Sequence, residues 1–310
     1  MPFYLGIDTS NYTTSLALYD TESGAFRAAG KLLPVAEGAL GLRQSDAVFE
    51  HTRQLPEVWE KLGPVTEQIS AVGASVTPRR AEGSYMPCFL VGKTVGISIS
   101  KALKIPFHDF SHQQGHLAAA IRGSGQDGLF GQAFLAFHVS GGTTDLLAVR
   151  DESLCVDCIG GSADLKAGQL VDRVGRLLGL AFPAGPALEK LAAAAEGKIP
   201  KIRCSVRGLF CNLSGGYNLC EKLYADTGSK ELTARYCLSF IAEHLLFLAR
   251  KAREERGNLP ILFSGGVMSN QLIRARIEGA LDRVFFAPPA WSADNARGIA
   301  LLTAREEGQA

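Results

Sequence analysis

Two histidines four positions apart are the clearest chemical feature of the sequence. His112 and His116 belong to the run His-Gln-Gln-Gly-His, at the start of a helix predicted over 113–121. Residues i and i+4 share one face of a helix, so both imidazoles could bind one metal ion. The alternative is a pair of polar residues at a helix start. A zincin protease would need Glu after the first histidine, and Gln113 stands there instead.

A third metal ligand would have to come from a distant part of the chain. Asp294 is the candidate, because it opens a predicted helix after a proline-containing segment. Aspartate in that position is equally an ordinary helix N-cap. His244 lies in a mainly apolar helical stretch, so we expect it to be a packed core residue rather than a ligand.

Three further aspartates are candidates for phosphate or ribose chemistry. Asp8 and Asp145 stand in predicted strand–turn–strand segments, where a carboxylate could hold a hydrated cation near phosphates. We take these two as candidate catalytic residues, against the alternative that they only shape turns. Asp172 lies in a predicted helix and could accept a ribose hydroxyl, or be a solvated helix residue.

Ser-Gly-Gly turns follow two predicted buried strands, at 140–142 and 264–266. Glycine lets the backbone approach a phosphate or a planar base, and exposed amides in such a turn bind anions. Two of these turns after buried strands favour a nucleotide site. A Rossmann site and a P-loop are not supported. The glycines at 123–128 follow a helix rather than a strand, and Pro87 stands where a P-loop would begin with glycine.

The elements that must position these residues repeat along the chain. Strands are predicted at 3–7 and 15–19 around a polar turn, and again at 133–139 and 146–149 around another. The repeat distance of about 130 residues is far longer than that of a solenoid. This pattern predicts two related domains that each open with a hairpin, and therefore a duplication.

Helices are predicted between and after the hairpins. They cover 94–104, 165–180, 186–195, 232–253, 270–281 and 294–305, with short strands at 260–263 and 284–286. A further helical pattern over 48–62 is interrupted by Pro56. Helices that alternate with strands indicate an α/β fold of two lobes, 1–130 and 131–310, with the last helix able to pack back on the first lobe. The join is expected within the glycine-rich segment 123–131.

Composition limits the partners and the location. The 310 residues carry 32 basic and 31 acidic side chains, a formal net charge of +1 that does not favour tight autonomous binding of nucleic acid. Basic residues gather only locally, at Arg79 and Arg80 and over 198–207, as solvated surface or as polyanion contacts. Seven cysteines indicate free thiols in a reducing compartment. Finding no export signal and no run of about 18 apolar residues, we expect a cytoplasmic protein without a membrane span.

Segments in chain order resemble the tRNA threonylcarbamoyladenosine synthase family, the TsaD/Gcp group. They are 5–10, 112–116, 138–142, 168–188, 210–215, 264–270 and 293–295, and they extend over nearly the whole chain. The run Leu-Gly-Ile-Asp-Thr-Ser at 5–10 is similar to the family's opening phosphate hairpin. The run at 112–116 is similar to its HxEGH metal helix, and 168–188 resembles its central signature.

The resemblance implies a duplicated actin-like ATPase fold, with two lobes around a nucleotide cleft. It implies that iron or zinc is bound by His112, His116 and Asp294. It also implies contacts with ATP or threonylcarbamoyl-adenylate from His138, Val139, Ser140, Gly141, Gly142, Asp172, Gly185, Gly265, Gly266 and Asn270. Family members transfer the threonylcarbamoyl group to N6 of an adenosine beside the tRNA anticodon. The partners it implies are tRNA, a homologous actin-like protein and a small ATPase of the same pathway, with a homodimer as the alternative.

Several acidic residues of the family pattern are absent. The family's Thr-Ser-Cys-Asp-Glu-Thr is here Thr-Ser-Asn-Tyr-Thr-Thr over 9–14, and Gln114 replaces the Glu of the metal helix. Leu165 and Gln169 replace two further acids, and Thr143 replaces a histidine. Losing carboxylates changes the charge near a phosphate and removes candidate general bases. Three hypotheses follow: threonylcarbamoyl transfer to tRNA, a paralogue acting on another acceptor, and a non-catalytic scaffold that binds nucleotide and a partner.

Overall fold

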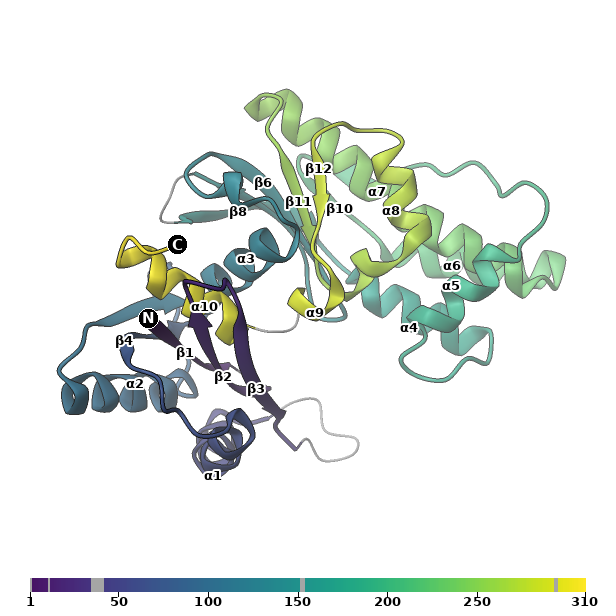
Figure 1. The fold of residues 1–310 in the computed structure, drawn as a ribbon. Helices are drawn as coiled ribbons and strands as arrows, with labels where there is room; N and C mark the ends of the chain where they lie inside the picture. The colour runs from purple at the N-terminus through teal and green to yellow at the C-terminus, as the bar shows by residue number, and fades with distance from the viewer. Residues whose placement is uncertain (1, 11, 35–41, 151–153, 293–294) are drawn as a thin grey trace. The chain divides into compact units, whose positions relative to one another are not determined.

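The computed structural model describes residues 2–10, 12–34, 42–150, 154–292 and 295–310. The chain divides into two compact units, which we call unit 1 (1–123 with 290–310) and unit 2 (124–289) (Figure 1). The boundary after Gly123 falls in the segment where the join was expected. Residues 290–310 were expected in the second lobe, with a last helix able to pack back on the first. They belong to unit 1, because the helix that they form packs against the first sheet.

Unit 1 is built on a five-stranded sheet in the order β3-β2-β1-β4-β5. Its strands are β1 (Phe3–Ser10), β2 (Thr13–Asp20), β3 (Phe26–Leu32), β4 (Ile69–Thr77) and β5 (Phe107–Ser111). β1 runs antiparallel to β2 and parallel to β4. The prediction that the first strand stops at residue 7 is wrong, because the polar residues 8–10 are buried and continue the ladder opposite 13–15. Asp8 therefore lies inside a strand rather than in a turn.

Helices cover both faces of this sheet. They are α1 (Gln44–Leu62), α2 (Phe89–Leu103), α3 (His112–Gly123) and α10 (Asn295–Glu306), with the short α9 (Pro289–Ser292) before α10. Leu5 and Ile7 of β1 pack with side chains of α1 and α2. Gly6 meets α10 instead, where an added Cβ would lie 2.2 Å from the carbonyl oxygen of Ala296. Contrary to expectation, α1 runs unbroken through Pro56, because its buried side packs against β2 and β3.

Unit 2 repeats this topology and extends it. Its seven-stranded sheet has the order β12-β11-β6-β7-β8-β10-β9. The strands are β6 (Phe134–Val139), β7 (Thr144–Val149), β8 (Val156–Ser162), β9 (Val206–Arg207), β10 (Phe210–Cys211), β11 (Ile261–Ser264) and β12 (Val284–Phe286). The run β8-β7-β6-β11-β12 matches β3-β2-β1-β4-β5 strand for strand, with the same antiparallel and parallel pairs. The backbone pairing thus confirms the predicted duplication.

The helices of unit 2 enclose the larger hydrophobic core. They are α4 (Ala167–Leu177), α5 (Gly185–Ala193), α6 (Ser214–Thr227), α7 (Lys230–Arg256) and α8 (Gln271–Glu278), with 3₁₀ turns η1 (Asp127–Leu129) and η2 (Gly266–Ser269). Among the described helices, α7 alone is long and apolar enough to cross a membrane by length and composition, and 72% of its apolar window is buried inside the protein. His244 of α7 is fully buried, as expected. Its Nε2 accepts a hydrogen bond of 3.1 Å from the amide of Ser205.

Candidate functional site

A capping box positions the two predicted histidines of unit 1. The hydroxyl of Ser111, at the end of β5, accepts a hydrogen bond of 3.2 Å from the amide of Gln114. The side-chain oxygen of Gln114 accepts in return from the amide of Ser111 at 2.8 Å. This reciprocal pair satisfies amides that have no partner inside the helix, so α3 begins at His112. His112 and His116 therefore lie one turn apart, with ring centroids 4.5 Å from each other.

Asp8 is the carboxylate that contacts this histidine pair. It lies in β1 and is 1% exposed. Its Oδ1 is 3.0 Å from Nδ1 of His112, and it also accepts a short hydrogen bond from the hydroxyl of Ser75. Burial alone would raise the pKa of Asp8, but the charge of His112 and hydrogen bonds from His112, Ser75 and Ser10 outweigh burial and lower the pKa below its usual range. Asp8 is therefore an ionised group that fixes the ring of His112.

Asn295, at the start of α10, also contacts His112. Its side-chain nitrogen lies 3.0 Å from Nε2 of His112 and in short contact with Nδ1. Its Oδ1 is buried and has no hydrogen-bond partner among the described residues. Within the same residues, no three His, Cys, Asp or Glu side chains are grouped so as to hold a metal ion, and the predicted third ligand, Asp294, lies outside them. Among the described residues, this place offers a cation two imidazoles and one amide oxygen that has no hydrogen-bond partner there.

A third histidine, to which no sequence motif pointed, belongs to the same part of unit 1. His51 of α1 is fully buried, and its Nδ1 lies 2.8 Å from the hydroxyl of Thr14 on β2. Burial lowers the pKa of His51 against the opposing charge of Asp8. Its Nε2 has no partner in the part of the chain that the structure describes. His51 and His112 belong to different helices, so no spacing in the sequence could have linked them.

The second candidate catalytic carboxylate, Asp145, has a different setting in unit 2. It is half-buried on β7, directly opposite His138 of β6 in the antiparallel ladder. Residues opposite each other in such a ladder project from the same face of the sheet. Nδ1 of His138 lies 3.2 Å from the hydroxyl of Ser264 on β11. His138 therefore contacts the second Ser-Gly-Gly turn through Ser264, and Asp145 lies beside His138 on the neighbouring strand.

The first Ser-Gly-Gly turn is held by its own backbone and by α4. The amide of Ser140 donates to the carbonyl of Thr143 at 2.8 Å, and the hydroxyl of Ser140 accepts from the amide of Thr143 at 3.1 Å. Gly168, in the first turn of α4, lies directly against Gly141. A Cβ added to Gly168 would be 2.6 Å from the Cα of Gly141. Only glycine lets the helix start approach the turn so closely.

The second Ser-Gly-Gly turn leads into η2 and α8. Gly265 has a φ of +97°, and a Cβ added to it would lie 2.3 Å from the carbonyl oxygen of Val139. Both the backbone conformation and the contact therefore require glycine. Asn270 then caps α8, since its Oδ1 accepts a hydrogen bond of 3.0 Å from the amide of Ile273. These local requirements explain why the turn carries this particular sequence.

The two turns border a cavity of about 350 Å³ in unit 2, which we call the glycine hollow. Five of the residues expected to contact the adenylate line it: Gly141, Asp172, Gly185, Gly266 and Asn270. The other five, His138, Val139, Ser140, Gly142 and Gly265, are not part of its wall. Phe182 and Glu189 also line the hollow, although no motif in the sequence pointed to them.

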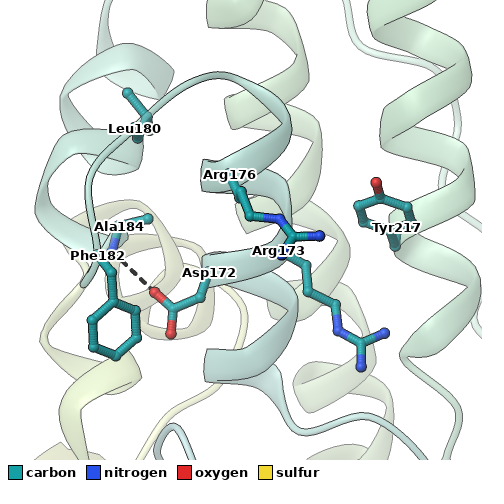
Figure 2. A pocket seen from close by; sticks show the side chains of 7 residues that line it. All are labelled: Asp172, Arg173, Arg176, Leu180, Phe182, Ala184 and Tyr217. Carbon is teal, nitrogen blue, oxygen red and sulfur yellow. Dashed lines mark hydrogen bonds between the residues drawn. The ribbon is translucent and has the colours of Figure 1, made fainter. Parts of the chain in front are cut away.

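The wall of the glycine hollow combines apolar surface with a few polar groups. Val171, Leu238 and Val267 supply apolar surface. The Oδ1 of Asp172 accepts a hydrogen bond of 2.9 Å from the amide of Ala184, which fixes the direction of this carboxylate (Figure 2). Bare glycine backbone with a few placed polar groups suits a planar base joined to a sugar.

Comparison with known proteins gives a family. The family model for TsaD, tRNA N6-adenosine threonylcarbamoyltransferase, matches residues 49–301, more than half of the chain. The matched region contains the histidine pair of α3 and the whole glycine hollow, whereas β1 and Asp8 precede it.

Solved structures give the fold. Component A of the (R)-2-hydroxyglutaryl-CoA dehydratase of Acidaminococcus fermentans has a TM-score of 0.57 at 15% identity, covering 99% of this chain and 100% of that one. The activator of the 2-hydroxyisocaproyl-CoA dehydratase from Clostridium difficile, with bound ADPNP, has a TM-score of 0.53 at 12% identity, covering 99% and 96%. Full-length HypF in its phosphate- and nucleotide-bound form has a TM-score of 0.59 at 14% identity, covering 97% and 46%. At such identities the likeness shows the fold alone, which is the predicted actin-like ATPase fold.

Proposed function

The chain belongs to the tRNA N6-adenosine threonylcarbamoyltransferase family, and we propose that it transfers a threonylcarbamoyl group from threonylcarbamoyl-adenylate to N6 of an adenosine in tRNA. The family match over 49–301 carries the proposal. In the reaction, N6 attacks the carbonyl carbon of the threonylcarbamoyl group. The new N–C bond forms, the C–O bond to the phosphate breaks, AMP leaves with the electron pair, and N6 loses a proton.

The glycine hollow is the proposed site for the adenylate, or for ATP. Gly141 and Gly266 leave room for the backbone to approach the ligand, and the exposed turn at 140–142 offers amides to a phosphate. Asp172 and Asn270, which line the hollow, are the polar groups that we propose to make hydrogen bonds with the ribose or the base. The bound ADPNP of the dehydratase activator, a protein of the same fold, supports a nucleotide here. Holding the adenylate still would supply much of the rate gain through orientation.

A divalent metal, iron or zinc, is proposed to be held by His112, His116 and Asp294. The fit rests on two imidazoles 4.5 Å apart and on the unpartnered Oδ1 of Asn295. When bound, the metal would act as a Lewis acid on the carbonyl region of the adenylate. An imidazole whose Nδ1 proton is held by a carboxylate can bind a metal through Nε2, so the role of Asp8 is to orient His112 and make it more basic. The amide nitrogen of Asn295, 3.0 Å from this Nε2, would turn away when the metal binds. Asp145 is kept as the candidate catalytic carboxylate of unit 2.

The partners and the location complete the proposal. We expect tRNA as acceptor, with a homologous actin-like protein and a small ATPase that make the adenylate and support turnover; a homodimer is the alternative. An odd number of cysteines, seven in all, suits a compartment where thiols stay reduced, so we propose a cytoplasmic location.

The test is the formation of N6-threonylcarbamoyladenosine from threonylcarbamoyl-adenylate and unmodified tRNA, with the family partners present. Nucleoside mass spectrometry of digested tRNA gives the readout. We expect modified adenosine with the wild type and at least a tenfold loss, on the order of one removed transition-state contact, with His112→Ala. Adenylate turnover without modified adenosine would contradict tRNA as the acceptor.

A second candidate function is transfer to another acceptor. It is favoured by the missing acids and by Gln114, whose Oε1 already accepts hydrogen bonds from Ser111 and Arg80 and so serves the helix start. The third hypothesis, a scaffold without catalysis, requires that adenylate binds and is never consumed. The same assay separates these two outcomes, because it follows both adenylate and tRNA.

A further inference from the structure

A second and larger cavity opens beside the glycine hollow in unit 2. It has a volume of about 740 Å³, and we call it the arginine hollow. Arg173 and Arg176 of α4, Phe182 from the loop before α5, and Tyr217 of α6 line it (Figure 2). The local basic groups that the sequence suggested, over 198–207 and at Arg79 and Arg80, do not contribute to this wall.

The two arginines form an uncompensated positive pair. They are three residues apart on α4, so they project from neighbouring positions of one helix face. Both are exposed, and neither guanidinium group makes an ion pair or a hydrogen bond with any described residue. Figure 2 shows that the carboxylate of Asp172 points toward Ala184, while both arginine side chains extend to the other side of the helix. The guanidinium groups are therefore available to an anion that comes from outside the chain.

Phe182 adds an aromatic face at the rim of the cavity. Its side chain is 83% exposed, which leaves its ring open to a ligand. Positive groups beside exposed aromatic rings are typical of sites for single-stranded nucleic acid, where phosphates meet arginine and bases stack on rings. A cavity of about 740 Å³ also exceeds what a lone phosphate would fill.

The arginine hollow and the glycine hollow share two wall residues, Asp172 and Phe182. A strand bound in the first would thus present a base next to a ligand in the second. We infer that the arginine hollow binds a single-stranded segment of the acceptor RNA, with backbone phosphates on Arg173 and Arg176 and an unstacked base on Phe182. This inference rests on the proposed function for the identity of the acceptor. It explains how a chain with a net charge of +1 can hold RNA through a local pair of charges.

The test is the affinity of the full-length protein for fluorescently labelled, unmodified tRNA over a series of salt concentrations. We expect Arg173→Gln/Arg176→Gln to weaken binding about tenfold and to reduce the slope of log affinity against log salt by about 1.4, which is about 0.7 for each phosphate that no longer meets an arginine. Phe182→Ala should weaken binding about fivefold without changing the slope, because it removes stacking and no charge. Arg250→Gln is the matched control, since it removes an exposed arginine of α7 that lies in a cavity with Glu243 and Glu254.

Each other outcome overturns the inference in a recognisable way. If the arginine variant binds tRNA with wild-type affinity and slope, the RNA lies elsewhere, whereas the transferase proposal stands or falls by its own product assay. If the variant loses ATP affinity in a parallel titration and keeps tRNA affinity, the arginines serve the phosphates of the nucleotide instead. If Arg250→Gln reduces the slope as much, the effect is one of total charge and no site is present.

Discussion

The two units share one strand order, yet their equivalent hairpins carry different chemistry. Asp8 of β1 and His138 of β6 hold the same place in the repeat, each two residues before a serine. In unit 1, buried side chains of this hairpin make the hydrogen bonds. Asp8 bonds to His112, and the hydroxyl of Thr9 donates to the carbonyl of Cys88 at 3.0 Å. In unit 2 the matching turn at 140–142 offers backbone instead, and glycines of other segments pack around it.

This difference between side-chain contacts in unit 1 and bare backbone in unit 2 indicates how one duplicated fold can bind two kinds of ligand. Carboxylate and imidazole groups suit a cation, because they can share charge with it through fixed donors. Bare backbone suits a flat base and a phosphate, because amides bind anions and no Cβ obstructs the approach. At the two candidate ligand sites, we therefore expect the removal of side chains to matter most around Asp8 and His112, and added volume on glycine to matter most at the Ser-Gly-Gly turns of unit 2.

The largest expected effect is that of Gly265→Ala. The new Cβ would meet the carbonyl oxygen of Val139 at 2.3 Å, on a backbone with φ of +97°. We expect the free energy of unfolding to fall by about 3 kcal/mol or more, from strain and overpacking together. The control is Gly266→Ala, whose Cβ would meet nothing within 4 Å. Urea unfolding of both variants gives the measurement. Equal stabilities would contradict the claim that the turn at Gly265 requires glycine for its backbone conformation and its contact with Val139.

Next in size is the removal of Asp8. Asp8→Ala leaves the buried hydroxyl of Ser75 and the ring of His112 without their shared acceptor, so we expect a loss of about 2 kcal/mol in the free energy of unfolding. Asp145→Ala removes a half-buried carboxylate and should change stability by less than about 1 kcal/mol. Chemical denaturation compares the two. A larger loss for Asp145→Ala would reverse the comparison between the units.

Helix caps allow a sharper separation of stability from ligand binding. Asn270 caps α8 beside the glycine hollow, and Ser229 caps α7 away from it, with a hydrogen bond of 3.1 Å from the amide of Leu232. Either change to alanine should lower stability by about 1 kcal/mol. Only Asn270→Ala should also weaken ATP binding, by about tenfold in a calorimetric titration. An equal loss of ATP affinity in Ser229→Ala would mean that ATP binding weakens because unit 2 as a whole is less stable, and not because a contact of Asn270 is lost.

The smallest expected effect is a pH dependence shared by the units. Burial lowers the pKa of His51 in unit 1 and of His244 in unit 2. The unfolded chain therefore takes up protons first, and stability that is complete above the unfolded pKa near 6.5 is lost as the pH falls below it. Each histidine should contribute at most about 0.7 kcal/mol between pH 7 and pH 6. Unfolding curves of His51→Gln and His244→Gln should each show a shallower pH slope than the wild type. Unchanged slopes would contradict a pKa lowered by burial in either ring.

Much of the fold could be predicted from the sequence, because the duplication repeats the same strand–turn–strand pattern in both units. Each hairpin has a buried strand, a polar turn and a second strand, and the pairing of β1 with β2 and of β6 with β7 confirms both. β3 gave no clear signal, because it alternates only weakly and is half exposed at the edge of its sheet. β4 carries a glycine at position 73 that makes room for Thr303 of α10, a contact that no local pattern contains.

Contacts in the candidate site could be predicted from the sequence only where the residues are close in the chain. The spacing of His112 and His116 predicted their common face, and the Ser-Gly-Gly turns predicted bare backbone. The contact of Asp8 with His112 joins residues 104 positions apart, and it depends on the order of strands in the sheet. Phe182 enters both hollows because the loop before α5 turns its ring outward, which no spacing rule encodes.

The claim that unit 1 binds the metal and unit 2 binds the nucleotide is tested most directly by anomalous diffraction from one crystal grown with zinc and AMP. We predict a zinc peak about 2.0–2.1 Å from a ring nitrogen of both His112 and His116, and AMP in the glycine hollow against Asn270. A zinc peak away from both imidazoles, or AMP bound outside the glycine hollow, would contradict the account.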